Sequence, residues 1–290
     1  MTAAGYMAAF LFLCVTESAA QDERMSGVVD GTPDMSSSAD IDLILMRDWV
    51  IDETDIAMGL DVWADGPEIR VIFCDQIAGV LGSFDPGTGV VVGELPLCPS
   101  NSDCFGVTFD SDPADQVWYT NDENDACLYY TEDLSNWYTI ANPSLQHGRG
   151  MDFDGAWYWE TFGDSGVYRF QPGGSQELID LPGIPDTLSG LTVFPLGSNL
   201  GIAATCFESE NLFFYEWDGV TATCLGAAAC PSAVKDSCNY GLAYCEQNEM
   251  LYWSYISASD EVKIAEISFE INTVLEQSSW GGIKSVFGDL

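Results

Sequence analysis

The chain has 290 residues, of which 47% are hydrophobic and 12% aromatic, which is enough for a sizeable core and too much for a disordered acidic chain. It carries 46 Asp and Glu residues against 8 Lys and Arg, a formal net charge of −38. Such a surface repels nucleic acid and anionic membranes, so both are excluded as partners, and cations or basic molecules are attracted.

The N-terminus predicts a signal peptide over residues 1–20. An apolar run from Ala8 to Val15 leads into Ser18-Ala19-Ala20, small residues at the positions that signal peptidase requires. The run is too short to cross about 30 Å of hydrocarbon comfortably, so we expect no transmembrane segment in the mature chain. We therefore expect a secreted protein, whether periplasmic, released or held on the cell surface.

The next segment, residues 21–40, is polar and without periodicity, which predicts a flexible leader. From residue 41 to residue 278 the chain consists of short β-type runs separated by Gly, Asp, Asn and Pro. No window sustains a helical period over ten or more residues. We therefore predict one all-β domain over 41–278, followed by a separate C-terminal tail over 279–290.

One pattern recurs through this domain: Gly, an aliphatic residue, a small or polar residue, then a large apolar one. The copies begin at Gly59, Gly106, Gly150, Gly190 and Gly241. Each is followed by two further strand-like runs, and most units add a shorter fourth. Four strands repeated every 40 to 50 residues are typical of β-propeller blades. We predict five four-stranded antiparallel blades, with residues 42–52 as a closure strand; six blades and a β-sandwich are the alternatives.

The stretch Gly150–Trp159 shows what the pattern does locally. The glycine lets the backbone crowd near the central axis, where a side chain has no room. Met151 and Phe153 alternate into the blade core, and Asp154-Gly155 forms the hairpin turn. Trp157 and Trp159 then fill the wider space between neighbouring blades.

Cysteine usage agrees with an oxidising compartment. Nine cysteines remain if Cys14 leaves with the signal peptide, so at least one is free or bonds another chain. Cys98 with Cys104, and Cys230 with Cys238, each close a short loop and are the predicted local disulfides. Zinc is the alternative use, but the chain has no Cys-x-x-Cys spacing and only one His.

The blade pattern resembles secreted bacterial propellers of the NHL-repeat, YVTN and virginiamycin B lyase-like group. The best-matching runs are QVWYTND (116–122), GVYRFQPGG (166–174) and GSFDPGTG (82–89), and the likeness extends over residues 59–278. The resemblance implies the propeller architecture. Many such domains bind proteins or sugars, and some are enzymes; the lyase uses histidine and acidic residues with a metal.

In a propeller, the loops between second and third strands and the loops that lead into inner strands lie at the same end of the central axis. Loops on a rigid scaffold carry function, so we expect the ligand site there. The candidate ligand-binding residues are Asp75, Asp122, His147, Arg149, Asp164, Glu208 and Asp260. Asp122 and Asp164 are candidates for a Ca²⁺ site, since Ca²⁺ prefers several oxygen ligands. The alternative is that these acidic residues only stabilise turns.

His147 and Arg149 bring rare positive groups to this acidic end. His147 is a candidate general base and Arg149 an anion clamp; the alternative is that Arg149 pairs with Asp122 or Asp164. We therefore expect a secreted binding or interaction scaffold, stabilised by calcium, for a protein, glycan or small-molecule ligand. The alternative is a metal-dependent lyase or hydrolase with its site around His147.

Overall fold

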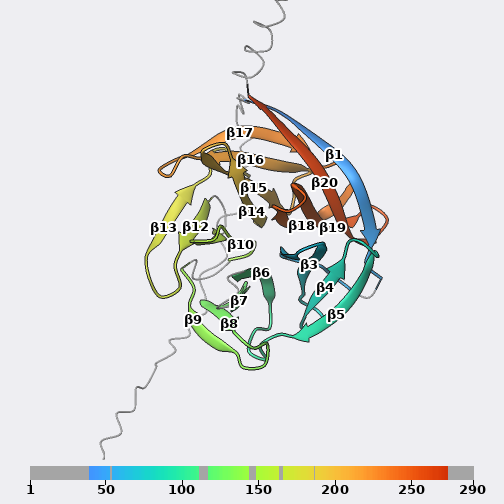
Figure 1. Ribbon diagram of the computed structural model, residues 1–290, viewed down its shortest axis with the longest axis vertical. Coiled ribbons are helices and arrows are strands. Elements are labelled where there is room, and N and C mark those ends of the chain that lie inside the picture. Colours follow the sequence, from blue (N-terminus) through green and yellow to red (C-terminus); the bar gives the residue numbers. More distant parts are fainter. Residues whose placement is uncertain are drawn as a thin grey trace, which may run out of the picture. The chain divides into compact units, whose positions relative to one another are not determined.

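The computed structural model describes residues 39–52, 54–110, 117–143, 148–162, 166–185 and 187–273. Over these residues the protein is all-β and forms five four-stranded antiparallel sheets, each of which is one blade (Figure 1). The predicted signal peptide, most of the leader and the C-terminal tail lie outside the described residues. The described part contains no helix that is long and apolar enough to cross a membrane.

The first four blades each consist of consecutive strands. Blade 1 contains β2 (Leu60–Asp65), β3 (Glu68–Asp75), β4 (Val80–Asp85) and β5 (Val90–Pro96). Blade 2 contains β6 (Cys104–Asp110), β7 (Val117–Asp122), β8 (Cys127–Thr131) and β9 (Tyr138–Ala141). Blade 3 contains β10 (Met151–Phe153), β11 (Tyr158–Phe162), β12 (Gly166–Phe170) and β13 (Gln176–Asp180). Blade 4 contains β14 (Leu188–Leu196), β15 (Asn199–Cys206), β16 (Asn211–Trp217) and β17 (Ala222–Ala229).

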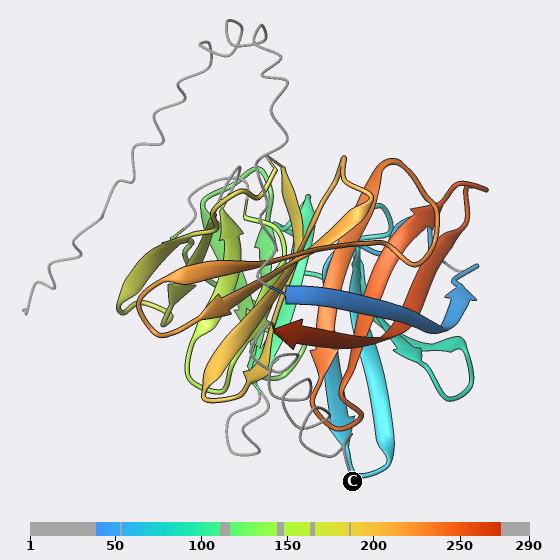
Figure 2. The ribbon, with the colours of Figure 1, turned by 90° about the horizontal axis from the view of Figure 1, so that it is seen from above.

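Blade 5 is built from both ends of the described chain, and this closes the ring. It contains β18 (Val234–Cys245), β19 (Met250–Ser257), β20 (Val262–Thr273) and, as its outermost strand, β1 (Ala39–Val50). β1 pairs antiparallel with β20 from Ala39 opposite Thr273 to Val50 opposite Lys263, and the two strands run side by side in Figure 2. The predictions of five blades and of a closure strand are both confirmed.

The five inner strands, β2, β6, β10, β14 and β18, contact one another in turn around the axis. The repeated glycines allow this close approach. A Cβ atom built on each would lie 2.0 to 2.5 Å from a backbone atom of the next blade, closer than any real contact; the five are Gly59, Gly106, Gly150, Gly190 and Gly241. The prediction that no side chain fits at these positions is confirmed.

The stretch after Gly150 folds largely as predicted. Met151 is buried, and the carboxylate of Asp154 holds the turn by accepting the amides of Ala156 and Trp157. Trp159 is fully buried in a cluster that also contains Trp217 of blade 4, so it does fill space between blades. Phe153 is only half-buried.

Candidate functional site

Hydrogen bonds join neighbouring blades at the level of the five repeated glycines, which we call the glycine belt. At two of the five interfaces the bond runs directly between backbones. The Gly59 amide donates to the carbonyl of Phe105 at 2.7 Å, which links blade 1 to blade 2. The Gly150 amide donates to the carbonyl of Ser189 at 2.9 Å, which links blade 3 to blade 4.

At the other three interfaces a polar side chain of the second strand relays the bond. In blade 5, the Gly241 amide donates to Ser254 Oγ, and Ser254 Oγ donates to the carbonyl of Met58 in blade 1, both at 2.9 Å. Thr205 makes the same relay from Gly190 of blade 4 to blade 5.

Asn121 relays the bond from blade 2. Its Oδ1 accepts the Gly106 amide at 2.6 Å, and its Nδ2 donates to the carbonyl of Arg149 at 2.7 Å. All five interfaces are therefore bridged at the glycine belt. On one side of the belt is the loop end, where the chain leads into the inner strands; on the other is the hairpin end, where inner strands turn into second strands.

Aromatic side chains and one arginine pack together at the loop end. The ring of Phe207 lies edge-on to Phe105 and Tyr240, with centroids 5.5 and 5.9 Å away. The guanidinium of Arg149 lies 4.8 Å from the Phe207 centroid.

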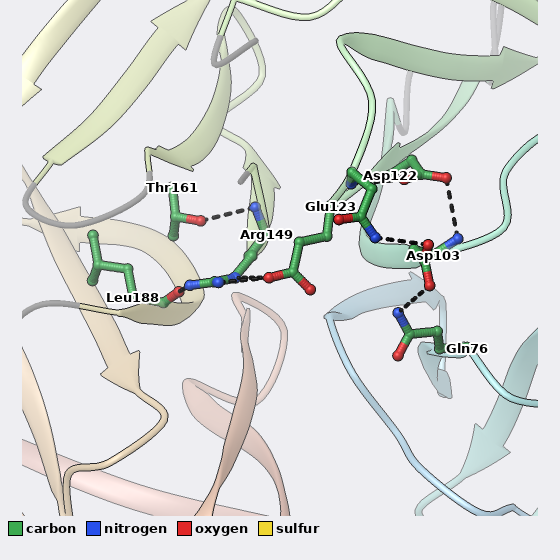
Figure 3. A network of polar contacts seen from close by, with 8 residues as sticks. Gln76, Asp103, Asp122, Glu123, Arg149, Thr161 and Leu188 are labelled. Atoms are coloured by element: carbon green, nitrogen blue, oxygen red, sulfur yellow. Dashed lines mark hydrogen bonds and ion pairs between the residues drawn. The ribbon is translucent and has the colours of Figure 1, made fainter. Parts of the chain in front are cut away.

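The charge of Arg149 is paired within this end (Figure 3). Its guanidinium donates to Glu123 of blade 2, at 2.5 Å from Nη2, and to the carbonyl of Leu188 of blade 4 at 3.0 Å. The sequence predicted Asp122 or Asp164 as the alternative partner, and the structure places Glu123, the neighbour of Asp122, in that position. Arg149 therefore ties three blades together, and its charge is already balanced.

The predicted ligand carboxylates Asp75 and Asp122 are buried and hold turns. Asp122 accepts the backbone amides of Ser102, Asp103 and Asn124 at 2.8 to 3.1 Å. Asp75 accepts the amide of Ala78 at 2.9 Å, together with the hydroxyl of Thr54. Their oxygens are engaged by the protein, as the turn-stabilising alternative expects.

The other loop-end candidates do not gather into one site in the described part of the chain. Glu208 is exposed, and Asp260 is exposed and paired with Lys235. His147 and Asp164 lie outside the described residues. Among the residues that are described, no group of three or more His, Cys, Asp or Glu is placed to hold a metal. The loop-end ligand site, the calcium site and the roles of His147 stay predictions.

The hairpin end holds a cavity of about 510 Å³ that sequence reasoning missed. All five inner strands or their hairpins contribute to its wall; the residues include Asp61, Phe109, Asp152, Asp154, Val193, Tyr244 and Glu246. Four of these seven side chains are carboxylates. The wall of the cavity thus combines carboxylates from blades 1, 3 and 5 with aromatic and aliphatic side chains.

Asp61 and Asp152 occupy the same repeat position, two residues after the glycine, in blades 1 and 3. Asp61 accepts the Val62 amide at 2.6 Å and, across the interface, the Phe109 amide of blade 2 at 2.8 Å. Asp152 accepts the Val193 amide of blade 4 at 2.6 Å in the same way. Each carboxylate therefore satisfies a backbone donor on the free edge of the next inner strand.

The protonation of these two carboxyls is shifted. Burial raises the pKa of Asp61 well above its usual value, and the negative charge of Asp152 raises it further. Burial likewise raises the pKa of Asp152 to about 6, with the charge of Asp154 adding to the effect. No Lys or Arg forms an ion pair with either of them in the part of the chain that the structure describes.

A signal for this site was present in the sequence. The residues two positions after the five glycines are Asp61, Thr108, Asp152, Thr192 and Ala243. Two acids at one repeat position must lie at the same height around the axis, and that position lies toward the hairpin end. Reasoning from loops alone directed attention to the opposite end.

The described cysteines form no disulfide in the structure: Cys98, Cys104, Cys230 and Cys238 are free thiols. The two predicted local pairings therefore remain predictions. Cys104 lies instead against Cys74 of blade 1, with the two Sγ atoms 2.7 Å apart.

Comparison with known proteins gives the fold class and no family. No protein-family model matches the chain, and no curated protein matches it. Solved structures do match, among them bacterial β-propeller proteins.

A glutaminyl cyclase from Myxococcus xanthus is 14% identical, with a TM-score of 0.55 over 80% of this chain and 97% of that one. A gluconolactonase from Xanthomonas campestris is 13% identical, with a TM-score of 0.53 over 80% and 87%. The PQQ-bound aldose sugar dehydrogenase from Streptomyces coelicolor is 13% identical, with a TM-score of 0.51 over 80% and 99%. At these identities the likeness shows the β-propeller fold alone.

Proposed function

We propose that this protein is a ligand-binding β-propeller whose site is the hairpin-end cavity and whose ligand is a small organic cation with amine groups. One observation carries the proposal: Asp61 and Asp152, from non-adjacent blades, line one cavity with raised pKa values and no cationic partner among the described residues. Buried carboxylates of this kind are stabilised by a positive charge brought to them.

The chemistry of the wall supports an ammonium ligand. Each oxygen of Asp61, and Oδ1 of Asp152, accepts one backbone amide and keeps a lone pair for a charged donor, and such hydrogen bonds are the strong ones. Oδ2 of Asp152 is already filled by the Val193 amide and the Thr192 hydroxyl. Phe109, Phe153 and Tyr244 also line the cavity, and aromatic faces attract cations. A ligand with two amines would engage Asp61 and Asp152 together.

Size and charge agree with this choice. The cavity volume of about 510 Å³ falls within the range that proteins use for small organic ligands, which is larger than a bare ion needs. The net charge of −38 raises the concentration of cations near the whole surface. Selectivity must therefore come from the cavity, and the test has to separate it from this general attraction.

Isothermal titration calorimetry with 1,4-diaminobutane, in about 0.15 M NaCl to screen surface charge, tests the proposal. We expect saturable binding at one site, weaker binding of butylamine, and none of butanol. Asp61→Asn and Asp152→Asn should each weaken binding about 10- to 100-fold, the value of a hydrogen bond to a charged group.

Asp65→Asn is the matched control, since Asp65 is exposed on the same strand as Asp61 and does not line the cavity. It should leave the affinity unchanged. Absence of saturable binding, or an equal loss in the Asp65 variant, would overturn the proposal.

Two predictions from the sequence are proposed separately. Secretion is supported by the signal-like pattern of residues 1–20; N-terminal sequencing of protein recovered outside the cytoplasm should begin after Ala20. Calcium stabilisation is supported by the number of acidic residues in the loop-end segments of the sequence, whereas Asp122 itself already accepts three backbone amides. It should appear as a higher melting temperature with Ca²⁺ than with chelator.

A further inference from the structure

We propose that Cys74 and Cys104 form a disulfide that joins blade 1 covalently to blade 2. The two Sγ atoms lie 2.7 Å apart, and both side chains are buried, with 0% and 1% of their surface exposed. Cys74 is in β3 of blade 1 and Cys104 begins β6 of blade 2, so the bond would cross the blade interface.

The repeat explains why a cross-link belongs here. Cys74 faces Gly59 across the first hairpin, as Asn121 faces Gly106 and Ser254 faces Gly241. In blades 2, 4 and 5 this position carries the polar side chain that relays the glycine belt to the next blade. Blade 1 carries a thiol there, whose contact with the backbone of blade 2 is a long one, 3.6 Å to the carbonyl of Gly106. A disulfide to Cys104 supplies the missing side-chain link to the next blade.

The reaction requires an oxidant, which we take to be a disulfide compound such as oxidised glutathione or a disulfide-exchanging protein. One thiolate attacks this disulfide, forms a mixed disulfide and releases one thiol. The second thiolate attacks the mixed disulfide at the protein's sulfur and releases the second thiol. Two protein thiols thus lose two protons and two electrons, and one oxidant disulfide becomes two thiols.

Burial sets when the bond forms and how it breaks. Burial raises the pKa of the Cys74 thiol, so the thiolate that reacts is scarce once the blades have packed. We therefore expect oxidation to occur before blades 1 and 2 close together. Once formed, the bond is shielded, and dithiothreitol should reduce it only when the protein is unfolded.

This pairing excludes the Cys98–Cys104 bond predicted from loop length, because Cys104 can join only one partner. Peptide mapping separates the two directly. Cleavage before aspartate by Asp-N protease places Cys74 in residues 65–74, Cys98 in 85–102 and Cys104 in 103–109. The full chain, folded in a glutathione redox buffer, is unfolded, blocked with N-ethylmaleimide, digested without reduction and analysed by mass spectrometry.

The expected result is peptide 65–74 linked to peptide 103–109, at a mass two hydrogens below their sum. Peptide 85–102 linked to 103–109, or Cys74 and Cys104 both carrying N-ethylmaleimide, would overturn the proposal. The result depends only on the wild-type protein, so it stands whether or not any variant folds.

Variants give the second readout. Cys74→Ala and Cys104→Ala should each lower the melting temperature by about 5 to 15 °C, as expected for a chain of this size that loses one disulfide. Cys98→Ala should leave the 65–74/103–109 link intact. Alanine is preferable to serine at Cys74, because serine could relay the glycine belt as Ser254 does.

Discussion

The carboxylate of Asp61 in blade 1 accepts a hydrogen bond of 2.8 Å from the backbone amide of Phe109 in blade 2. β6 has no strand on its axial side, so without Asp61 this amide would lack a partner within the sheet. The proposed cation-binding group is therefore also part of the blade interface. Asparagine removes the charge and keeps one carbonyl oxygen, which can still accept the Phe109 amide, but its NH2 group then faces the Val62 amide that the second carboxylate oxygen accepts.

Replacing Asp152 by asparagine should change how stability depends on pH. The pKa of Asp152 is raised to about 6 in the folded protein, from 3.8, so the folded state holds the proton more tightly than the unfolded state. The resulting stabilisation is complete below about pH 4 and is lost as the pH rises through about 6. Two pKa units correspond to at most about 3 kcal/mol.

Urea unfolding between about pH 4.5 and 7.5 checks this expectation. The stability of the wild type minus that of Asp152→Asn should fall as the pH rises across this window. Two curves that run parallel would show that Asp152 titrates in the folded state as it does in the unfolded chain.

Gly106→Ala should destabilise the protein by about 2 to 4 kcal/mol, because the new Cβ would lie 2.0 Å from the carbonyl oxygen of Arg149. Gly93→Ala is the matched control: Gly93 lies in β5, and its Cβ would meet nothing within 4 Å. Denaturant titration of both variants should show a change within about 0.5 kcal/mol for Gly93→Ala. Equal losses would mean that the glycine belt tolerates a methyl group.

The Arg149–Glu123 pair should show measurable coupling in a double-mutant cycle. Arg149 is 12% exposed and also donates to Leu188, so the pair is partly shielded from water. We expect a coupling energy of about 1 to 2 kcal/mol from the cycle made of Arg149→Met, Glu123→Gln and the double variant. The Lys235–Asp260 pair, 49% and 70% exposed, is the comparison and should give a clearly smaller coupling energy, since water screens it. Coupling no larger than that of the exposed pair would contradict a structural role for Arg149.

Substitutions in the closure strand β1 should lower the stability of the protein on one face of the strand only. Leu43 packs into the core of blade 5, whereas its neighbour Ile44 is 55% exposed. Leu43→Thr should lower the free energy of unfolding by about 1.5 to 3 kcal/mol, and Ile44→Thr by less than about 0.5 kcal/mol. A reversed order would mean that β1 pairs with β20 in a register shifted by one residue.

The repeat made the architecture predictable, since Gly59 and its four counterparts mark the place where each blade meets the next. The closure strand could also be predicted, because residues 42–52 alternate like a strand but belong to no complete unit. Both inferences depend on local pattern alone.

The hairpin-end cavity could not be predicted from local sequence pattern. Asp61 and Asp152 are 91 positions apart, and their interaction depends on how far around the ring blades 1 and 3 lie. The contact between Cys74 and Cys104 was not predicted for a related reason: loop length favoured the nearby Cys98 as the partner of Cys104, whereas the packing of two blades brings Cys104 to Cys74. Loop composition likewise suggested a site at Asp122, where turn geometry uses the same carboxylate.

The pairing of β1 with β20 also has a consequence for biosynthesis. Arg47 of β1 bonds Glu266 of β20 across 219 positions of sequence, so the first of the described strands must wait until the last of them has been synthesised. Until then neither edge of β1 is paired, which makes the strand a template for pairing with other chains; Ile44 and Met46 stay 55% and 49% exposed even in the closed ring. Closure of the ring is therefore a late event, and a nascent chain that stalls before β20 is the form most exposed to aggregation and to chaperones.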